Sequence, residues 1–292
     1  MSDFVISTDT ASDLPIDYVK AKDIDYHQLF YSLDGVLYGK EQVLEEKEFY
    51  KLVREGHIPT TTATNPEDSR ALFIERVKKG QGVIHIAFSS ALSASCQNAE
   101  LAKQMVLEEY PDAKITIIDS LSGSLGQGLL VYKAQELLES GKSYEEIVDW
   151  VMENRTHVGH QILVDDLMHL CRGGRISKSK ATIGSIVGVK PLININDEGK
   201  LINVTKLRGQ KKAFNYLIDC IENKQGRYKG QNDIVMIAHG DALDNAMQIG
   251  NAIKEKYGIE DIMYSYFSPT IGSHVGPGTV AVFYMQEERE KE

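Results

Sequence analysis

The sequence predicts an α/β protein of two units, the first with a parallel sheet covered by helices, the second an α+β unit with a mixed sheet. In the first half, short apolar runs that end in small polar residues alternate with helical patterns. This alternation is typical of a parallel, helix-covered sheet. The second half adds a predicted hairpin to further helices and strands, which indicates a mixed sheet. The change of character near Arg155–Gly159 places the expected boundary between residues 1–157 and residues 158–292.

The composition of the chain argues against several classes of function. The chain has 292 residues, 42% of them hydrophobic and 25% charged, which suits a soluble protein with room for two domains. Its net charge of −10 argues against general nucleic-acid binding and against attachment to anionic membranes. The three cysteines lie far apart without C-x-x-C spacing, which fits a reducing cytoplasm and speaks against a zinc site. We find no signal-peptide pattern and no apolar run of the ~18 residues that a membrane span needs, so we expect a cytoplasmic protein.

The stretch Ile84–Asn98 joins a buried strand to the first candidate binding groups. The apolar run Val83–Phe88 suits a buried parallel strand, and a helical pattern begins near Gln97. Four serines lie between them: Ser89, Ser90, Ser93 and Ser95. Open α/β sheets bind ligands at such strand ends, where hydroxyls and free N–H groups can hold an anion. A serine-rich helix cap is the alternative interpretation, because serine is favoured at helix starts.

Local signals predict the other elements of the first half. Asp34-Gly35 predicts a hairpin within Tyr26–Tyr38, Asp13 resembles an N-cap for a short helix beyond Pro15, and Ser143 caps a later helix. The remaining strands and helices are expected at Phe4–Ser7, Phe49–Gly56, from about Pro66 onward, Lys114–Asp119, Gly128–Ser140 and Tyr144–Asn154.

The second half is predicted in the same way. Strands are expected at Gly159–Val164, Lys190–Ile195, Leu201–Leu207, Ile234–His239, Tyr264–Phe267 and Val280–Tyr284. Helices are expected at Asp165–Arg172, Lys180–Val187, Lys211–Glu222 and Ala242–Tyr257. The charged end Gln286–Glu292 is predicted to be a frayed helix or tail.

Two loops carry groups that could meet a ligand. Four threonines stand between Pro59 and Pro66 and form a rigid, hydroxyl-lined loop, unless this is a plain linker before a helix. In the second loop, Gly272, Gly276 and Gly278 surround His274. Glycines let backbone approach a ligand closely, and a histidine there can donate to an anion or carry charge. A structural histidine is the alternative.

A third loop is basic. Arg172 and Arg175 flank Gly173-Gly174, which either ends a helix with a basic last turn or forms a positive surface for an acidic partner. We expect these arginines, with Arg208, to dock a partner rather than the ligand.

Common catalytic and metal motifs are missing from the sequence. Gly123-Ser124-Leu125-Gly126 has the wrong spacing for a nucleophile elbow, and no G-x-x-x-x-G-K-[ST] loop occurs. The eight histidines show neither H-x-H nor H-x-x-x-H spacing. We therefore predict no catalytic residue, no metal site and no cofactor.

Six segments follow one another along the chain: Ser7–Leu14, Thr61–Pro66, Ser89–Ser95, Leu170–Ile176, Val189–Leu192 and His274–Gly278. Together and in this order they resemble the DegV family, fatty-acid-binding proteins that include the FakB subunit of bacterial fatty acid kinase.

The resemblance implies a fold and a function. The fold would be two α/β domains, the first Rossmann-like, with a long-chain fatty acid between them. Hydroxyls matching Thr61 and Ser93 would hold the carboxylate, with His274, Thr62 and Gly272 nearby. The protein would be a non-catalytic subunit that presents the acid to a separate ATP-dependent kinase, which forms an acyl phosphate. Contact with membranes would be transient, for lipid exchange.

The chain departs from the family pattern in two places, and two other functions stay open. Ser93-Ala94-Ser95-Cys96 stands where the family usually has Ser-Gly-Thr-Tyr, and Thr62-Ala63-Thr64 where it usually has Ser or Thr, then Gln or Ala, then Pro. Both departures keep the hydroxyls but alter the shape expected of the pocket. The alternatives are a stand-alone acyl hydrolase or acyltransferase that uses Ser93 with His274, and a lipid-responsive regulator without a kinase.

Overall fold

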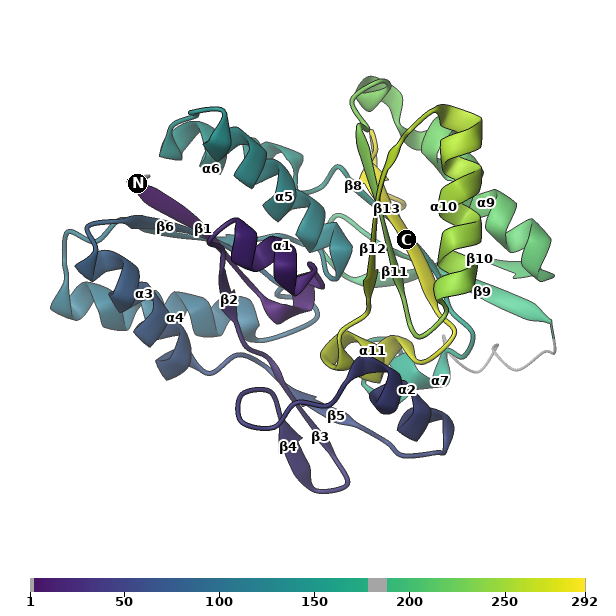
Figure 1. Cartoon of the computed structure of the whole chain (residues 1–292), viewed down its shortest axis with the longest axis horizontal. Coiled ribbons are helices and arrows are strands. Elements are labelled where there is room, and N and C mark those ends of the chain that lie inside the picture. Colours follow the sequence, from purple (N-terminus) through teal and green to yellow (C-terminus); the bar gives the residue numbers. More distant parts are fainter. Residues whose placement is uncertain (1–2, 178–187, 292) are drawn as a thin grey trace.

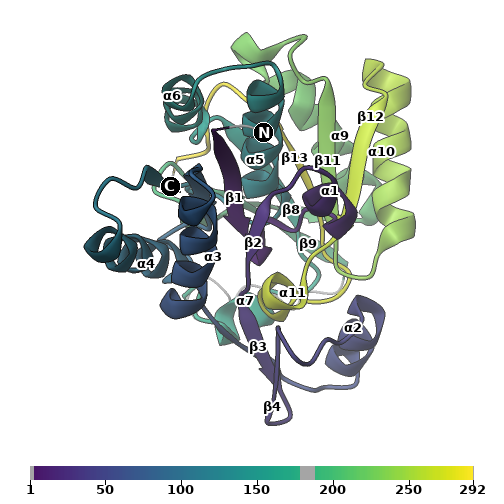
Figure 2. The same ribbon diagram turned by 60° about the vertical axis from the view of Figure 1, so that its left-hand side comes forward.

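The computed structural model describes residues 3–177 and 188–291 and contains three sheets (Figures 1 and 2). The predicted helix Lys180–Val187 lies outside the described residues. Among the residues described, no helix is both long and apolar enough to cross a membrane.

The first sheet is parallel, as predicted. Its strand order is β2-β1-β6-β7, and β6 is buried along its whole length. The strands are β1 (Phe4–Asp9), β2 (Asp25–His27), β6 (Gly82–Ala87) and β7 (Ile115–Asp119). The neighbouring helices are α1 (Ile16–Ala21), α3 (Pro66–Lys78), α4 (Ser95–Glu109), α5 (Leu125–Glu139) and α6 (Tyr144–Asn154). Helices α3 and α4 pack together on one face, and α5 and α6 lie on the other (Figure 1).

The second sheet is mixed, also as predicted. Its order is β10-β9-β8-β13-β11-β12, with β11 and β12 parallel and the other pairs antiparallel. The strands are β8 (Val158–Leu163), β9 (Val189–Ile195), β10 (Leu201–Arg208), β11 (Ile234–His239), β12 (Asp261–Tyr266) and β13 (Val280–Met285). The helices are α7 (Met168–Arg172), α9 (Gln210–Lys224), α10 (Leu243–Tyr257) and α11 (Pro269–Val275). Helices α9 and α10 cover the outer face, whereas α5 packs on β8, β11 and β13 from inside (Figure 1).

A small third sheet, β4-β3-β5, lies below the other two in Figure 1. It comprises β3 (Phe30–Leu33), β4 (Val36–Tyr38) and β5 (Thr60–Thr62), and α2 (Glu46–Arg54) connects β4 to β5. The predicted hairpin is confirmed: Asp34 and Gly35 have φ of 51° and 81°, the positive values that a tight hairpin turn requires. The segment predicted to be a threonine-rich loop is therefore partly a strand, because Thr60–Thr62 forms β5 and pairs with β3.

Three local predictions were wrong. Asp13 is not the N-cap of α1, a position that Pro15 occupies; it is buried and accepts hydrogen bonds from Ser124 Oγ (2.5 Å) and Ser268 N (3.0 Å). The glycine-rich segment before β13 contains the helix α11 rather than only a loop. The C-terminal segment is docked, because Gln286 and Arg289 are 1% and 4% exposed.

One apolar core joins the two units. Ile84, Leu125 and Phe88 of the first half belong to the same buried cluster as Ile162 and Phe283 of the second. The two large sheets are separate, but the buried side chains between them form one continuous apolar core. The division at residue 157 stays a prediction.

Candidate functional site

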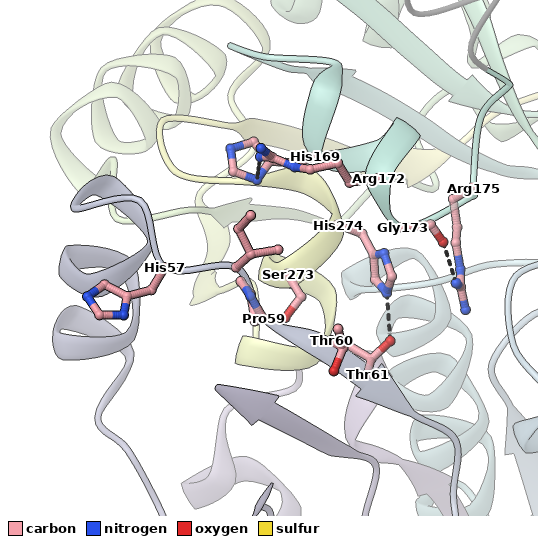
Figure 3. A pocket seen from close by; sticks show the side chains of 11 residues that line it. His57, Pro59, Thr60, Thr61, His169, Arg172, Gly173, Arg175, Ser273 and His274 are labelled. Carbon is pink, nitrogen blue, oxygen red and sulfur yellow. Dashed lines mark hydrogen bonds between the residues drawn. The ribbon is translucent and has the colours of Figure 1, made fainter. Parts of the chain in front are cut away.

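Two cavities meet at His274 and Arg175, which line both. The first is polar, measures about 220 Å³, and lies between β5, α7 and α11 (Figure 3). The second is narrow and almost wholly apolar, and its walls come from both units, including Phe88 and Leu92 on one side and Ile162 and Phe283 on the other. The arrangement therefore offers a charged entrance that leads to an apolar interior.

His274 stands at the junction of the cavities. Its Nε2 lies 2.8 Å from Thr61 Oγ1, while its buried Nδ1 has no partner among the described residues (Figure 3). The ring packs directly on Gly173, where an added Cβ would lie 2.0 Å from Nδ1. Burial, and then the nearby Arg175 charge, lower the pKa of His274 to about 4, so the imidazole is neutral at pH 7.

Thr61 reaches the site because of its place on β5. Side chains alternate along a strand, so Thr61 points to one side and Thr60 and Thr62 to the other. Thr61 is half-buried and Thr62 is exposed. Thr62 does not appear among the described residues that line the two cavities, and the structure therefore does not bring it to His274.

Ser93 lies one residue from the cavity wall. Its Oγ is 2.9 Å from Ser95 Oγ and accepts a hydrogen bond from Ser95 N at the start of α4. Its neighbour Leu92 lines the apolar cavity, and the Leu92 carbonyl accepts a hydrogen bond from Arg175 Nε at 3.0 Å. Ser93 itself is not among the described lining residues of either cavity, and its hydrogen bonds belong to the start of α4.

Gly272 serves a different contact from the one expected. An added Cβ would lie 2.4 Å from Tyr50 Oη, so the glycine lets α11 approach α2. It is not among the described lining residues of either cavity. The close approach that the sequence indicated is real, but the group that approaches is Tyr50 rather than a ligand.

The three arginines have different environments. Arg175 is half-buried, and its Nη1 donates to the Gly173 carbonyl at 2.6 Å (Figure 3). Burial lowers the pKa of Arg175 from its usual value. Arg172 is exposed on the rim of the polar cavity, and Arg208 is exposed at the end of β10 and is not a lining residue of that cavity. Arg175 therefore lines both cavities, whereas Arg172 lines only the polar one, and docking stays a prediction for all three arginines.

Sequence reasoning missed two histidines of the polar cavity, His57 and His169. His169 Nδ1 lies 3.1 Å from Arg172 Nη2, and because an arginine can only donate, His169 Nδ1 is the acceptor. Burial, followed by the Arg172 charge, lowers the pKa of His169. No Asp or Glu occurs among the described lining residues, so the cavity favours an anion. The sequence offered one signal that His169 lies beside Arg172, namely their i, i+3 spacing on a predicted helix.

Sequence reasoning also missed a polar pair in the wall of the apolar cavity. Ser124 lines this cavity with φ of 53° and donates to Asp13, which is buried and whose own φ is 53°. Burial raises the pKa of Asp13 to about 7. This hydrogen bond joins the loop after β1 to the start of α5. Asp13 also accepts a hydrogen bond from Ser268 N of the second unit.

Comparison with known proteins agrees with this architecture. The family model described as "Uncharacterised protein, DegV family" matches residues 3–287. The chain belongs to the DegV family. A DegV domain-containing protein of Clostridium perfringens is 41% identical over 292 residues, which cover 99% of this chain and 100% of the relative. One from Lactococcus lactis is 34% identical over 283 residues, 96% of each chain.

Solved DegV structures share the fold. The chain matches a Thermus thermophilus DegV family protein, described as fatty acid binding, with a TM-score of 0.86 and 27% identity over 98% of this chain and 100% of that one. It matches Bacillus subtilis DegV, "a fatty acid binding protein", with a TM-score of 0.85 and 28% identity over 98% and 100%. The predicted DegV-like α/β fold is thereby confirmed.

Proposed function

We propose that this protein binds a long-chain fatty acid, with its acyl chain in the apolar cavity and its carboxylate held by Thr61 and Ser93. The observation that carries the proposal is the meeting of an apolar interior and a basic entrance at His274 and Arg175. The fatty-acid binding described for the Thermus and Bacillus relatives supports it.

The energetics suit such a ligand. Each buried methylene contributes about 0.8 kcal/mol, so ~14 methylenes offer roughly 11 kcal/mol before the cost of association. A buried carboxylate must be hydrogen-bonded, and the Thr61 hydroxyl and the Arg175 guanidinium stand where the cavities meet. The apolar cavity measures about 60 Å³. Ligand pockets usually measure about 300–1,000 Å³, so loading must part the side chains that line it.

We propose further that the bound acid is presented to an ATP-dependent kinase subunit, which forms the acyl phosphate. The polar cavity supports this, because it opens from the carboxylate site toward Arg172 and its described lining lacks acidic residues. In this proposal the protein is a cytoplasmic, non-catalytic subunit without a cofactor, and it contacts membranes only to exchange lipid.

The two alternatives are separable from this function. An acyl hydrolase would pair Ser93 with His274, but in residues 3–177 and 188–291 their hydrogen bonds go to Ser95 and Thr61. Turnover of activated acyl esters by the purified protein would support the hydrolase. A lipid-responsive regulator would bind the acid yet fail to recover a kinase subunit in a pull-down.

Native mass spectrometry of protein from a bacterial host tests lipid binding directly. We expect the mass of one long-chain fatty acid per chain, released on denaturation and solvent extraction. Extracts free of fatty acid, together with no rise in melting temperature on adding any such acid, would refute the proposal.

Substitution then tests the carboxylate contacts. Thr61→Ala and Ser93→Ala should each weaken binding by about tenfold or more, because a charge-assisted hydrogen bond contributes ~1.5–3 kcal/mol. Thr62→Ala is the matched control, since Thr62 lies on the same strand and points to the other side. Binding curves that overlay the wild type for both test variants would remove these hydroxyls from the site.

A further inference from the structure

The C-terminal segment places a buried arginine behind the apolar cavity. Arg289 is 4% exposed, and five hydrogen bonds use all five of its N–H groups. The acceptors within the described chain are the Val158, Leu121, Asn196 and Arg155 carbonyls and Ser122 Oγ, at 2.7–3.1 Å. A guanidinium with every donor used and almost no exposure is fixed in place.

Arg289 fastens together segments that form the cavity wall. Its acceptors Leu121 and Ser122 directly precede Gly123, and its acceptor Asn196 directly follows Ile195. Gly123 and Ile195 both line the apolar cavity, one from each unit. A single side chain therefore links two wall-forming segments, one from each unit.

This arginine lies at the end of the cavity away from His274. Strand β8 starts at Val158, whose carbonyl binds Arg289, passes the cavity at Ile162 and continues toward α7 at the polar entrance. Four residues of strand correspond to about 13 Å. Antiparallel β13 agrees, since it leaves α11 near the entrance and its last residue, Met285, pairs with Val158.

A polar layer separates the cavity from the arginine. His160 lies on the same face of β8 as Ile162, one step closer to Arg289, and it packs edge-on against the cavity-lining ring of Phe283. His160 Nδ1 donates to the Val158 carbonyl at 3.0 Å, the same oxygen that accepts from Arg289 Nε. An acyl chain that grew past Phe283 would meet these buried polar groups.

We propose that Arg289 closes the methyl end of the acyl site and sets the longest chain that the protein accepts. The inference rests on the proposed fatty-acid binding and adds its length specificity. A methyl group pushed beyond the cavity would have to separate the buried Arg289 guanidinium from its acceptors, and leaving a buried charged donor unpaired is unfavourable. Affinity should therefore rise with chain length up to a break and then stop rising.

The test measures this break with delipidated protein and straight-chain saturated acids of ~12 to ~22 carbons, for which each buried methylene adds about fourfold in affinity. In Arg289→Lys the shorter ammonium, with three donors for five acceptors, loosens the closure, so the break should move to longer acids by about two carbons or more. Ser122→Ala removes one acceptor and should move it in the same direction by less. If Arg289→Lys fails to fold, the position of the break in Ser122→Ala tests the proposal instead.

Arg76→Lys is the matched control. Arg76 is also buried, at 7% exposed, but it is held by Asp23 and Asp25, and none of the three lines the apolar cavity. This variant should lose stability without moving the break. An unmoved break in folded Arg289→Lys and Ser122→Ala, or an equal loss of affinity at every length, overturns the inference. Wild-type protein that binds no acid of any length overturns the proposed function itself.

Discussion

His274 is neutral at pH 7 because burial lowers its pKa to about 4, and a carboxylate placed beside it would raise that pKa again. The sequence-based expectation started from an ordinary value near 6.5. In the structure the pKa of His274 without ligand is lower than that, because the ring is enclosed by Gly173 and Thr61 and lies near the Arg175 charge. A histidine whose pKa rises when the ligand binds takes up a proton with it.

We therefore predict a pH dependence of binding that belongs to His274. Because the bound-state pKa exceeds the free-state value, affinity should fall as pH rises from about 4 toward the bound-state value and stay level above it. The acid's own carboxyl titrates in a similar range, so the measurement is the difference in affinity profile between wild type and His274→Gln. Equal slopes in the two proteins would remove His274 from the head-group site.

The same histidine also makes the free energy of unfolding depend on pH. Its folded pKa of about 4 lies below the ordinary value of 6.5, so the unfolded chain binds more protons between these values. The contribution of neutral His274 is complete above pH 6.5 and is lost as pH falls through about 4.

Helices α7 and α11 show where element prediction succeeds and where it fails. The sequence predicts a helix that ends at the Gly173-Gly174 pair, and α7 ends there. It does not predict α11, because Pro269 and several glycines over a short span favour a loop. Pro269 occupies the first turn, where proline is tolerated, and Gly272 is retained because Tyr50 fills the space of a Cβ. The contact between Gly272 and Tyr50 explains why a glycine stands in this helix, and the local sequence does not reveal that contact.

The contact between these helices gives a prediction at the element scale. Gly173→Ala should displace the His274 ring, weaken fatty-acid binding by about tenfold and lower stability by ~1–3 kcal/mol, the usual effect of overpacking. Its backbone φ of −70° suits alanine, so the effect comes from the side-chain contact alone. Calorimetric titration and denaturant unfolding measure both changes.

Gly174→Ala is the neighbouring control. Gly174 has φ of 71° and nothing within 4 Å of an added Cβ, so alanine there strains the backbone by ~1–2 kcal/mol without touching His274. Stability should fall, but affinity should hold. If both variants lost affinity alike, backbone strain in this loop, rather than the position of His274, would explain the effect.

Across the whole molecule, local sequence patterns predicted individual strands and helices, but they did not predict contacts between residues far apart in the chain. Alternating apolar runs and caps predicted both sheets and most helices. The structure brings Thr61 and His274, both expected near the ligand, to the polar cavity, and it places Arg175, expected to dock a partner, in the same cavity. The polar cavity also needs His57 and His169, more than a hundred residues apart, and no periodicity links them. Arg289 was predicted to be in a frayed tail, because charge near a chain end usually indicates exposure, yet it donates to four carbonyls from three distant segments of the chain.

The charge distribution of the whole molecule leads to the last prediction. A protein of net charge −10 keeps Arg172 exposed on the rim of a cavity whose described lining is free of acidic residues. We predict that this rim docks the kinase subunit, with Arg208 at its margin. Arg172→Glu should slow acyl-phosphate formation by about tenfold or more, and less so at high salt, because exposed charges act by steering that salt screens. Fatty-acid affinity should stay unchanged, since Arg172 is bonded to His169 and not to Thr61 or His274.

Lys79→Glu changes the net charge equally from the exposed end of α3, far from α7 in Figure 1, and should leave the rate unchanged. Arg208→Glu shows how far the docking surface extends. Arg175→Gln provides the opposite pattern: this side chain is bonded to Leu92 and Gly173 within the site, so its loss should weaken lipid binding first. If Arg172→Glu weakened lipid binding as Arg175→Gln does, both arginines would belong to the lipid site, and the docking surface would have to lie elsewhere on the molecule.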